Sequence, residues 1–252
     1  MVKFSLVIPA KNEEKRILLP LLEYYAALQQ RFGSNNFEII VVINNTTDKS
    51  AITLQSVKEI LKATEIRIFD IGTTESKGRA VIYGLRKAKG NIIGFTDADG
   101  SYNAHEVMRM YRKLVLSKAD AIIPNRYLSE SQLVGELPLT RRVYSRIFNV
   151  TVRNLFGIPF TDTQGGLKLF TKKAVLSMLP QIITFGWACD VNMIVALRNS
   201  GMKVTESSIE WSQQAGSRLS FFLSGIEIFK DIWTLAIGQY FKRPFALLAS
   251  KN

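Results

Sequence analysis

The sequence predicts an α/β protein built around a mostly parallel sheet. Along the first half of the chain, short apolar runs rich in β-branched residues alternate with longer stretches of helical period. Strands that alternate with helices in this way form βαβ units with right-handed crossovers. Polar residues stand where these strands end, and in open α/β sheets ligands bind beyond the carboxyl ends of the strands.

The predicted elements follow each other in a regular order. Apolar, β-branched runs predict strands at residues 4–8, 37–43, 66–71, 91–96 and 119–123, and Pro9 is expected to end the first. Apolar residues recurring every three or four positions predict helices at residues 14–31, 51–63, 77–87 and 105–116. After Arg126 we expect an arginine-rich helix at 138–156, strands at 165–170 and 204–209, and a helix at 188–199.

The C-terminal segment has its own pattern, a loop followed by an amphipathic helix within residues 216–240. Its apolar side carries Phe222, Ile226, Phe229, Trp233, Ile237 and Tyr240, and its polar side carries Ser224, Glu227, Asp231, Thr234 and Gly238. Such a helix either docks on its own domain or lies in a membrane interface, and the sequence leaves both open. We therefore divide the chain into a domain at 1–218 and a C-terminal helix at 219–252.

Composition limits the class of protein. The 252 residues are 47% hydrophobic, which is enough for a folded core and argues against disorder. The net charge of +12 predicts an anionic partner: nucleic acid, a membrane surface or phosphorylated substrates. A single Cys189 and a single His105 exclude an internal disulfide and a poly-histidine metal site. No signal peptide and no apolar span stand out, so a cytoplasmic protein is expected.

Two carboxylates, Asp97 and Asp99, follow the strand predicted at 91–96. Neighbouring carboxylates repel each other unless a cation lies beside them. Oxygen ligands favour Mg²⁺ or Mn²⁺, ions that also bind substrate phosphates. The segment therefore predicts a divalent metal site, and the alternative is an acidic loop.

Other polar residues follow the remaining strands. Asn12 and Glu14 could hold a nucleoside or form a helix cap, and Asn44 could contact a nucleobase or form a turn. Lys77 opens a helix, where backbone N–H groups favour phosphate. The glycine spacing excludes a P-loop and a dinucleotide-binding motif.

The second half of the chain adds basic and amide side chains. Arg126 follows a strand, and Arg142 and Arg146 share one helical face, which is either solvated or meets lipid phosphates. Asp162 and Gln164 precede two glycines that allow close approach of a ligand to the backbone. Asp190 stands at a helix start, where capping is the alternative to a role in the site.

In series, these motifs resemble the family-2 glycosyltransferases of the GT-A fold over about residues 4–218. Within that family the chain is similar to the polyprenyl-phosphate (dolichyl-phosphate) hexosyltransferases, and closest to the dolichyl-phosphate β-glucosyltransferase branch. The matching motifs are Val-Ile-Pro-Ala-x-Asn-Glu-Glu at 7–14, Glu-Ile-Ile-Val-Val at 38–42, Lys-Gly-x-Ala at 77–80, Asp-Ala-Asp at 97–99, Arg-Tyr at 126–127 and Asp-Thr-Gln-x-Gly-x-Lys-Leu-Phe at 162–170.

The resemblance implies an inverting enzyme that moves a hexose from a nucleotide diphosphate sugar to a polyprenyl phosphate. UDP-glucose is the favoured donor and GDP-mannose the next. The metal, Mg²⁺ or Mn²⁺, would bind Asp99 and Asp97. The donor would contact Pro9, Ala10, Asn12, Glu14, Asn44, Lys77 and Asp97. Catalysis would involve Asp97, Asp99, Arg126 and Asp190. The acceptor and its phosphate would meet Arg126, Arg142, Arg146, Asp162, Gln164 and Arg218.

Two positions depart from the family pattern. Asn44 stands where an acidic residue usually reads the base, and Lys11 replaces a residue that is often tyrosine. A catalytically silent nucleotide-sugar-binding relative, which Asn44 suggests, stays open, and so does a glycosyltransferase with a soluble glycan or small-molecule acceptor. We expect the protein on the cytoplasmic face of a membrane with anionic lipids, with a membrane-protein partner or a homo-oligomer left open. Nucleic acid is not expected, because no recognised nucleic-acid module accompanies the charge.

Overall fold

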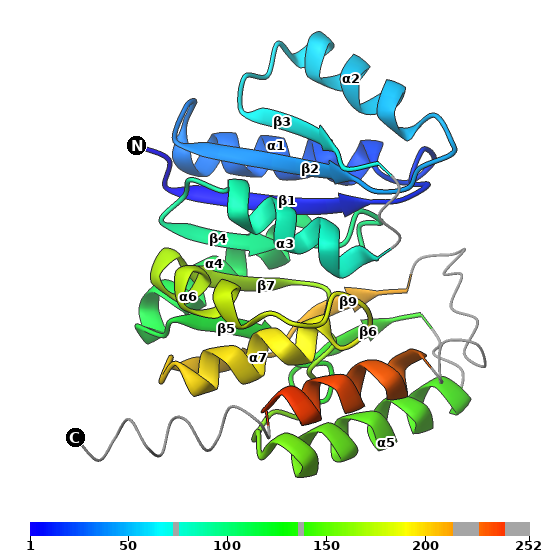
Figure 1. Cartoon of the computed structure of the whole chain (residues 1–252). Helices are drawn as coiled ribbons and strands as arrows, with labels where there is room; N and C mark the ends of the chain where they lie inside the picture. Colours follow the sequence, from blue (N-terminus) through cyan, green and yellow to red (C-terminus); the bar gives the residue numbers. More distant parts are fainter. Residues whose placement is uncertain (73–75, 136–138, 214–226, 240–252) are drawn as a thin grey trace.

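The computed structural model describes residues 1–72, 76–135, 139–213 and 227–239 (Figure 1). Its central sheet has the strand order β3-β2-β1-β4-β7-β5-β8, and β7 alone runs antiparallel to its neighbours. These results confirm the α/β class and the mostly parallel sheet. The strands are β1 Phe4–Ala10, β2 Phe37–Ile43, β3 Ile66–Asp70, β4 Ile92–Phe95, β5 Ala121–Pro124, β7 Lys168–Thr171 and β8 Val204–Ser207.

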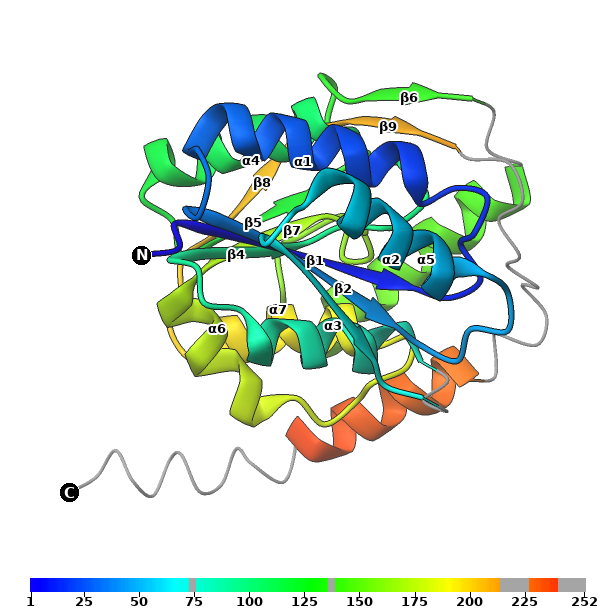
Figure 2. The same ribbon diagram turned by 90° about the horizontal axis from the view of Figure 1, so that it is seen from above.

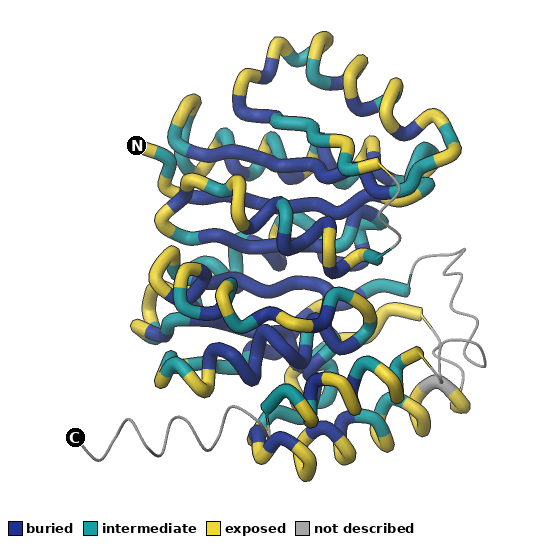
Figure 3. Tube along the Cα trace, viewed as in Figure 1, coloured by how far each residue is buried: buried dark blue, intermediate teal, exposed yellow. Residues whose placement is uncertain are grey.

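Helices cover both faces of this sheet (Figure 2), which explains why β1 and β2 are buried along their whole length (Figure 3). One apolar core joins the strands to α1 Leu18–Phe32, α2 Ser50–Leu61 and α4 Ala104–Ser117. A second core on the opposite face joins them to α3 Lys77–Lys87, α6 Lys172–Met178 and α7 Cys189–Asn199. The parallel strands therefore direct their carboxyl ends to one edge of the layered fold.

A third apolar cluster holds α5 (Leu139–Phe156) and the helix at 227–239 beside α7. Ile232 and Leu235 of the C-terminal helix are buried in this cluster, whereas Phe229 and Trp233 are exposed. The helix thus docks on the domain and keeps an apolar outer side. The predicted boundary near 218, and the apolar positions Phe222, Ile226 and Tyr240, lie outside the described residues. Within the described part of the chain, no helix has the length and apolarity that a membrane span requires.

Several element boundaries differ from the expectation for identifiable reasons. The first helix begins at Leu18, because a helix from Glu14 would place Pro20 in its interior instead of its first turn. Pro9 does not end β1, which continues to Ala10. In β1, Val7 accepts the amide of Thr96 after β4, and Pro9 faces the same side, where β4 has already ended.

The sequence patterns also missed short elements. Strands β6 (Gln132–Val134) and β9 (Glu210–Ser212) pair in a separate two-stranded sheet, and a 3₁₀ turn at Leu179–Gln181 follows α6. The strand expected at 165–170 begins only at Lys168, because the two preceding glycines belong to a loop. Elements of three residues are too short to display a hydrophobic period.

Candidate active site

A pocket of about 750 Å³ lies at the carboxyl edge of the sheet. Its size is typical of small-molecule sites. It collects the ends of β1, β2 and β4, the start of α3 and the start of α7, together with the C-terminal helix. The predicted site residues among those that line it are Pro9, Ala10, Asn44, Lys77, Asp97, Asp99, Gln164 and Asp190.

Asn44 follows β2 and is 1% exposed. Its Nδ2 donates to the carbonyl oxygen of Ser76 at 2.9 Å. Its Oδ1 has no hydrogen-bond partner within the residues that the structure describes. A buried acceptor without a partner costs about 1–3 kcal/mol, so a ligand donor arriving at this end of the pocket would be stabilised.

Lys77 and Asp97 both line the pocket and form an ion pair with each other. Burial raises the pKa of Asp97, Lys77 opposes that effect, and Asp99 and Asp190 add to it. Burial lowers the pKa of Lys77, but Asp97 and Asp190 outweigh it and the net direction is upward. Lys77 is therefore held as a cation among carboxylates that repel each other.

Gly166 explains how Asp97 is placed. A Cβ atom at Gly166 would overlap the Asp97 carboxylate, so only glycine lets the loop lie against that side chain. Gly165 has an equally close neighbour in Pro124. The sequence predicted that these glycines admit a ligand; in the structure they admit the side chains of the protein itself.

Asp97 and Asp99 present hard oxygen donors at the end of β4, and this donor set fits Mg²⁺ or Mn²⁺. Asp99 Oδ1 accepts from the amide of Ser101 at 3.0 Å. In the described ranges no three Asp, Glu, His or Cys side chains gather as a complete ligand set. The remaining ligands would therefore be substrate oxygens and water, as is usual for Mg²⁺.

Asp190 lies in the first turn of α7 but does not cap it, since the cap residue is Ala188. Its carboxylate instead pairs with the wholly buried Lys168, with Oδ1 to Nζ at 2.5 Å. Gln164 turns toward the same region and donates to the carbonyl oxygen of Trp187 at 3.2 Å. Asp190 and Gln164 thus line the pocket beside the start of α7.

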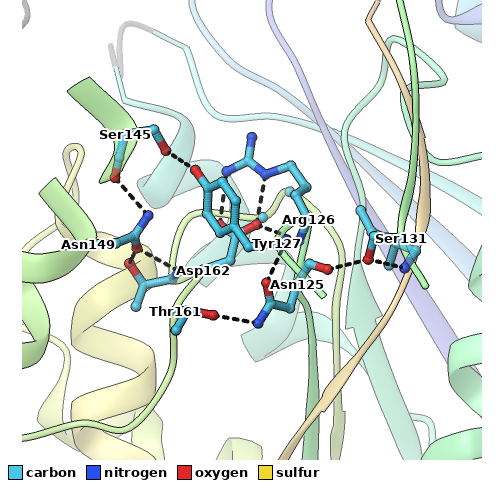
Figure 4. A network of polar contacts seen from close by, with 12 residues as sticks. Asn125, Arg126, Tyr127, Ser131, Ser145, Asn149, Thr161 and Asp162 are labelled. Atoms are coloured by element: carbon cyan, nitrogen blue, oxygen red, sulfur yellow. Dashed lines mark hydrogen bonds and ion pairs between the residues drawn. The ribbon is translucent and has the colours of Figure 1, made fainter. Parts of the chain in front are cut away.

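Arg126 and Asp162 form a buried pair beside the pocket (Figure 4). Asp162 Oδ2 accepts from Arg126 Nε at 2.7 Å and from its backbone amide at 3.0 Å, and Oδ1 accepts from Nη2 at 2.9 Å. Burial raises the pKa of Asp162, but Arg126 outweighs it and the pKa is lowered. Asp162 therefore holds Arg126 and is itself occupied, and neither residue is among those lining the pocket.

The other predicted phosphate contacts are more scattered. Arg142 and Arg146 are exposed on α5, and Arg146 lies over the Tyr127 ring at 5.9 Å. Tyr127 in turn shares a 2.7 Å hydrogen bond with Ser145 of the same helix. Arg218 lies outside the described residues. Arg142 and Arg146 thus lie outside the described pocket.

Asn12 and Glu14 also lie off the pocket. Asn12 Oδ1 accepts from the amide of Thr47 at 2.8 Å, and Glu14 Oε2 accepts from that of Lys49 at 3.2 Å. Both side chains therefore fix the loop that follows β2. Their neighbours line the pocket instead, as do further residues that the sequence interpretation did not assign: Lys11, Glu13, Trp187, Glu227, Lys230 and Asp231.

Asp231 is the most informative of these additions. It comes from the C-terminal helix, and its Oδ2 accepts from the amide of Ala188 at 3.4 Å. A Cβ atom at Gly186 would overlap its carboxylate, so Gly186 leaves the space it needs. The position of Asp231 on the polar side of the predicted amphipathic helix was the only signal in the sequence, and that signal does not distinguish a pocket from solvent.

The mostly parallel sheet with a pocket at its carboxyl edge has the architecture of the GT-A fold. Residues 5–178 match the family model described as glycosyl transferase family 2, and the chain belongs to this family. This finding confirms the resemblance drawn from the motifs.

Named relatives agree with this assignment. Dolichyl-phosphate beta-glucosyltransferase of Saccharomyces cerevisiae is 30% identical over 243 residues, covering 90% of this chain and 72% of that protein. The Dictyostelium discoideum protein of the same name is 26% identical, covering 92% of this chain and 73% of its own length. Glucosyl-3-phosphoglycerate synthase from Mycobacterium tuberculosis, crystallised with Mn²⁺, UDP-glucose and phosphoglyceric acid, has a TM-score of 0.66 at 15% identity over 94% of this chain and 79% of that chain. The last comparison confirms the fold alone.

Proposed function

We propose that this glycosyltransferase moves glucose from UDP-glucose to the phosphate of a dolichyl or related polyprenyl phosphate. The names of the curated relatives support this acceptor, since two of them match at least 90% of the chain. The observation that carries the proposal is the pocket itself, where Asn44, Lys77, Asp97 and Asp190 converge at the strand ends. GDP-mannose is the alternative donor.

The pocket orients the donor by its chemistry. Asn44 offers an unpaired acceptor to the base, and Lys77 offers a positive charge to the diphosphate. Mg²⁺ or Mn²⁺ bound by Asp97 and Asp99 would supply a Lewis acid that offsets the charge of the departing nucleoside diphosphate. The sugar then lies toward Asp190 and Gln164.

The transfer step needs little proton movement. The second pKa of a phosphate monoester lies near 6, so the acceptor is largely ionised at neutral pH. One of its oxygens forms the bond to the anomeric carbon while the bond from that carbon to the β-phosphate oxygen breaks, and UDP leaves. Direct attack of this kind inverts the anomeric centre. Two anions must approach each other, and Arg126, fixed by Asp162, supplies a charge near the acceptor side.

A membrane surface is the proposed location, on its cytoplasmic face. α5 exposes a row of apolar side chains that includes Val143, Ile147 and Val150, with Arg142 and Arg146 among them. The C-terminal helix packs in the same cluster as α5 and exposes Phe229, Trp233 and Ile237. Apolar and cationic side chains on neighbouring helices are typical of surfaces that rest in an anionic interface.

The experiment that tests the proposal offers the full chain two labelled donors, UDP-glucose and GDP-mannose, with Mn²⁺ and dolichyl phosphate in anionic vesicles. The expected result is a glucose label that becomes extractable into organic solvent, with release of an equal amount of UDP. A protein that floats with the vesicles and binds UDP but gives no lipid-linked sugar would overturn the acceptor assignment. Transfer to a soluble sugar in the absence of lipid would favour the soluble-acceptor alternative.

A further inference from the structure

Lys168 is a lysine without any exposed surface, placed in the middle of the central sheet. It lies on β7, the antiparallel strand between β4 and β5, and its side chain is 0% exposed. Burying an ammonium group is costly unless it is paired. Its Nζ donates to Asp190 at 2.5 Å and to the carbonyl oxygen of Gly165 at 2.6 Å, and it lies over the Phe95 ring at 5.4 Å. Among the described residues, Asp190 is its one ion-pair partner.

Asp190 stands between this lysine and the pocket. Its side chain is 21% exposed and lines the cavity, whereas Lys168 lies behind it and does not. The carboxylate Oδ1 is held by Lys168, so Oδ2 is the oxygen left for a ligand. Among the described residues, the other charged groups that line the pocket are Lys11, Glu13, Lys77, Asp97, Asp99, Glu227, Lys230 and Asp231. Most of these are acidic, so Asp190 would be repelled from the pocket without a cation behind it.

Gly165 connects the same lysine to the loop that carries Gln164. One ammonium group therefore fixes two elements at once: the first turn of α7 through Asp190, and the loop before β7 through the Gly165 carbonyl. Because β7 is paired on both sides, the lysine has a rigid base. A charge on a central strand is a stable support for a side chain that must keep one orientation.

We propose that Lys168 is a positioning residue, which holds the Asp190 carboxylate at the sugar side of the pocket for the transfer reaction. It acts through Asp190 and does not touch the substrate. Without Lys168, the Asp190 side chain loses its fixed rotamer and its counter-charge. Displacements of about 1 Å in a reacting group can lower a rate about 100-fold, so the effect is expected in kcat.

The test compares Lys168→Met with the unchanged protein. The expected result is a fall in kcat for transfer of at least about 10-fold, while the affinity for UDP with Mn²⁺, measured by calorimetry, stays within twofold. UDP lacks the sugar, so its binding reports the rest of the pocket. A structural loss would lower both quantities together. Equal kcat for Lys168→Met and the unchanged protein would overturn the proposal.

Two further variants make the outcome specific. In an Asp190→Asn background, Lys168→Met is expected to cause no additional loss of kcat, because residues that act as a unit are not additive. Lys168→Gln keeps an N–H donor at this position, and it replaces Lys168→Met in the same comparison if the latter does not fold. Additive losses in the double variant would contradict the positioning role.

The matched control is Arg67→Met, which removes another ion pair of the same sheet. Arg67 Nη1 lies 2.6 Å from Glu38 Oε2, at the end of β2 and β3 opposite the pocket. This variant is expected to lose stability and to keep its kcat. The inference rests on the proposed function, which places the donor sugar beside Asp190. If the unchanged protein transfers nothing to dolichyl phosphate, that function fails, and the same variants are compared by Mn²⁺-dependent hydrolysis of UDP-glucose.

Discussion

Replacing Asp162 with asparagine is predicted to destabilise the fold by about 3 kcal/mol, because it removes the anionic half of a buried pair. Asp162 is 0% exposed and Arg126 is 14% exposed, so solvent screens the pair little. Three hydrogen bonds from Arg126 end on this one carboxylate. Removal of one partner from a buried pair costs about 3–5 kcal/mol, and asparagine retains one acceptor oxygen, so the lower end applies.

The measurement is equilibrium unfolding in urea together with thermal unfolding at pH 7. For a chain of this length, about 3 kcal/mol corresponds to a loss of roughly 6–12 °C in Tm. Asp120→Asn is the control, since Asp120 accepts a backbone hydrogen bond from Lys203 and forms no ion pair within the described residues. That control is expected to change stability by less than about 1 kcal/mol.

The pH dependence of stability gives an independent check. The pKa of Asp162 is lowered in the folded protein, so its contribution is present above the unfolded pKa of about 4 and is lost as the pH falls through the folded value. The difference in stability between the unchanged protein and Asp162→Asn should therefore shrink below about pH 4. A double variant, Arg126→Met with Asp162→Leu, should recover most of the loss at pH 7. A loss below about 1 kcal/mol at pH 7, or one that persists unchanged in acid, would refute the reasoning.

Three other outcomes follow from the site. Asp99→Asn should weaken the binding of UDP with Mn²⁺, measured by calorimetry, at least about 10-fold because a hard oxygen ligand is lost. The control is Asp70→Asn at the end of β3, which should leave this affinity unchanged. Like Asp99, Asp70 accepts a hydrogen bond from the amide two residues later. Asp231→Asn should weaken the binding of UDP-glucose but not that of UDP, because Asp231 lies beside the start of α7. Equal losses of affinity for the two ligands would contradict a contact with the sugar. Phe229→Ser with Trp233→Ser should lower flotation with anionic vesicles without changing UDP binding, and unchanged flotation would count against the membrane surface.

Sequence patterns predicted the strands well because each central strand is buried on both faces. Continuous apolar runs, such as residues 39–43, have few alternative structures in a chain of this composition. The same logic located much of the pocket, since Asn44, Asp97 and Asp99 are polar residues directly beyond such runs. A polar residue at the carboxyl end of a buried parallel strand lies at the edge of the sheet where ligands bind.

The sequence patterns could not predict contacts between elements that are distant along the chain. Lys168 looks like the exposed position of an alternating strand, and only the insertion of β7 between β4 and β5 shows that it is buried. Asp231 was assigned to the polar side of a helix, and only its packing against Gly186 shows that this side meets the pocket. Asn12 and Glu14 have the residue types of a binding site. In the structure, however, their side-chain oxygens accept hydrogen bonds from backbone amides of the loop after β2.

The charge balance of the pocket argues that a divalent cation is needed for donor binding, although the chain as a whole is strongly basic. Among the residues that the structure describes, three lysines and six carboxylates line the cavity, and the carboxylates are Glu13, Asp97, Asp99, Asp190, Glu227 and Asp231. A diphosphate entering this pocket adds further negative charge, and lysines alone leave the sum negative. A divalent cation held by Asp97 and Asp99 would offset that repulsion. Chelation of the metal with EDTA should therefore weaken the binding of UDP more than the binding of uridine. Equal affinities for UDP with and without metal would show that the lysines are enough to bind the diphosphate.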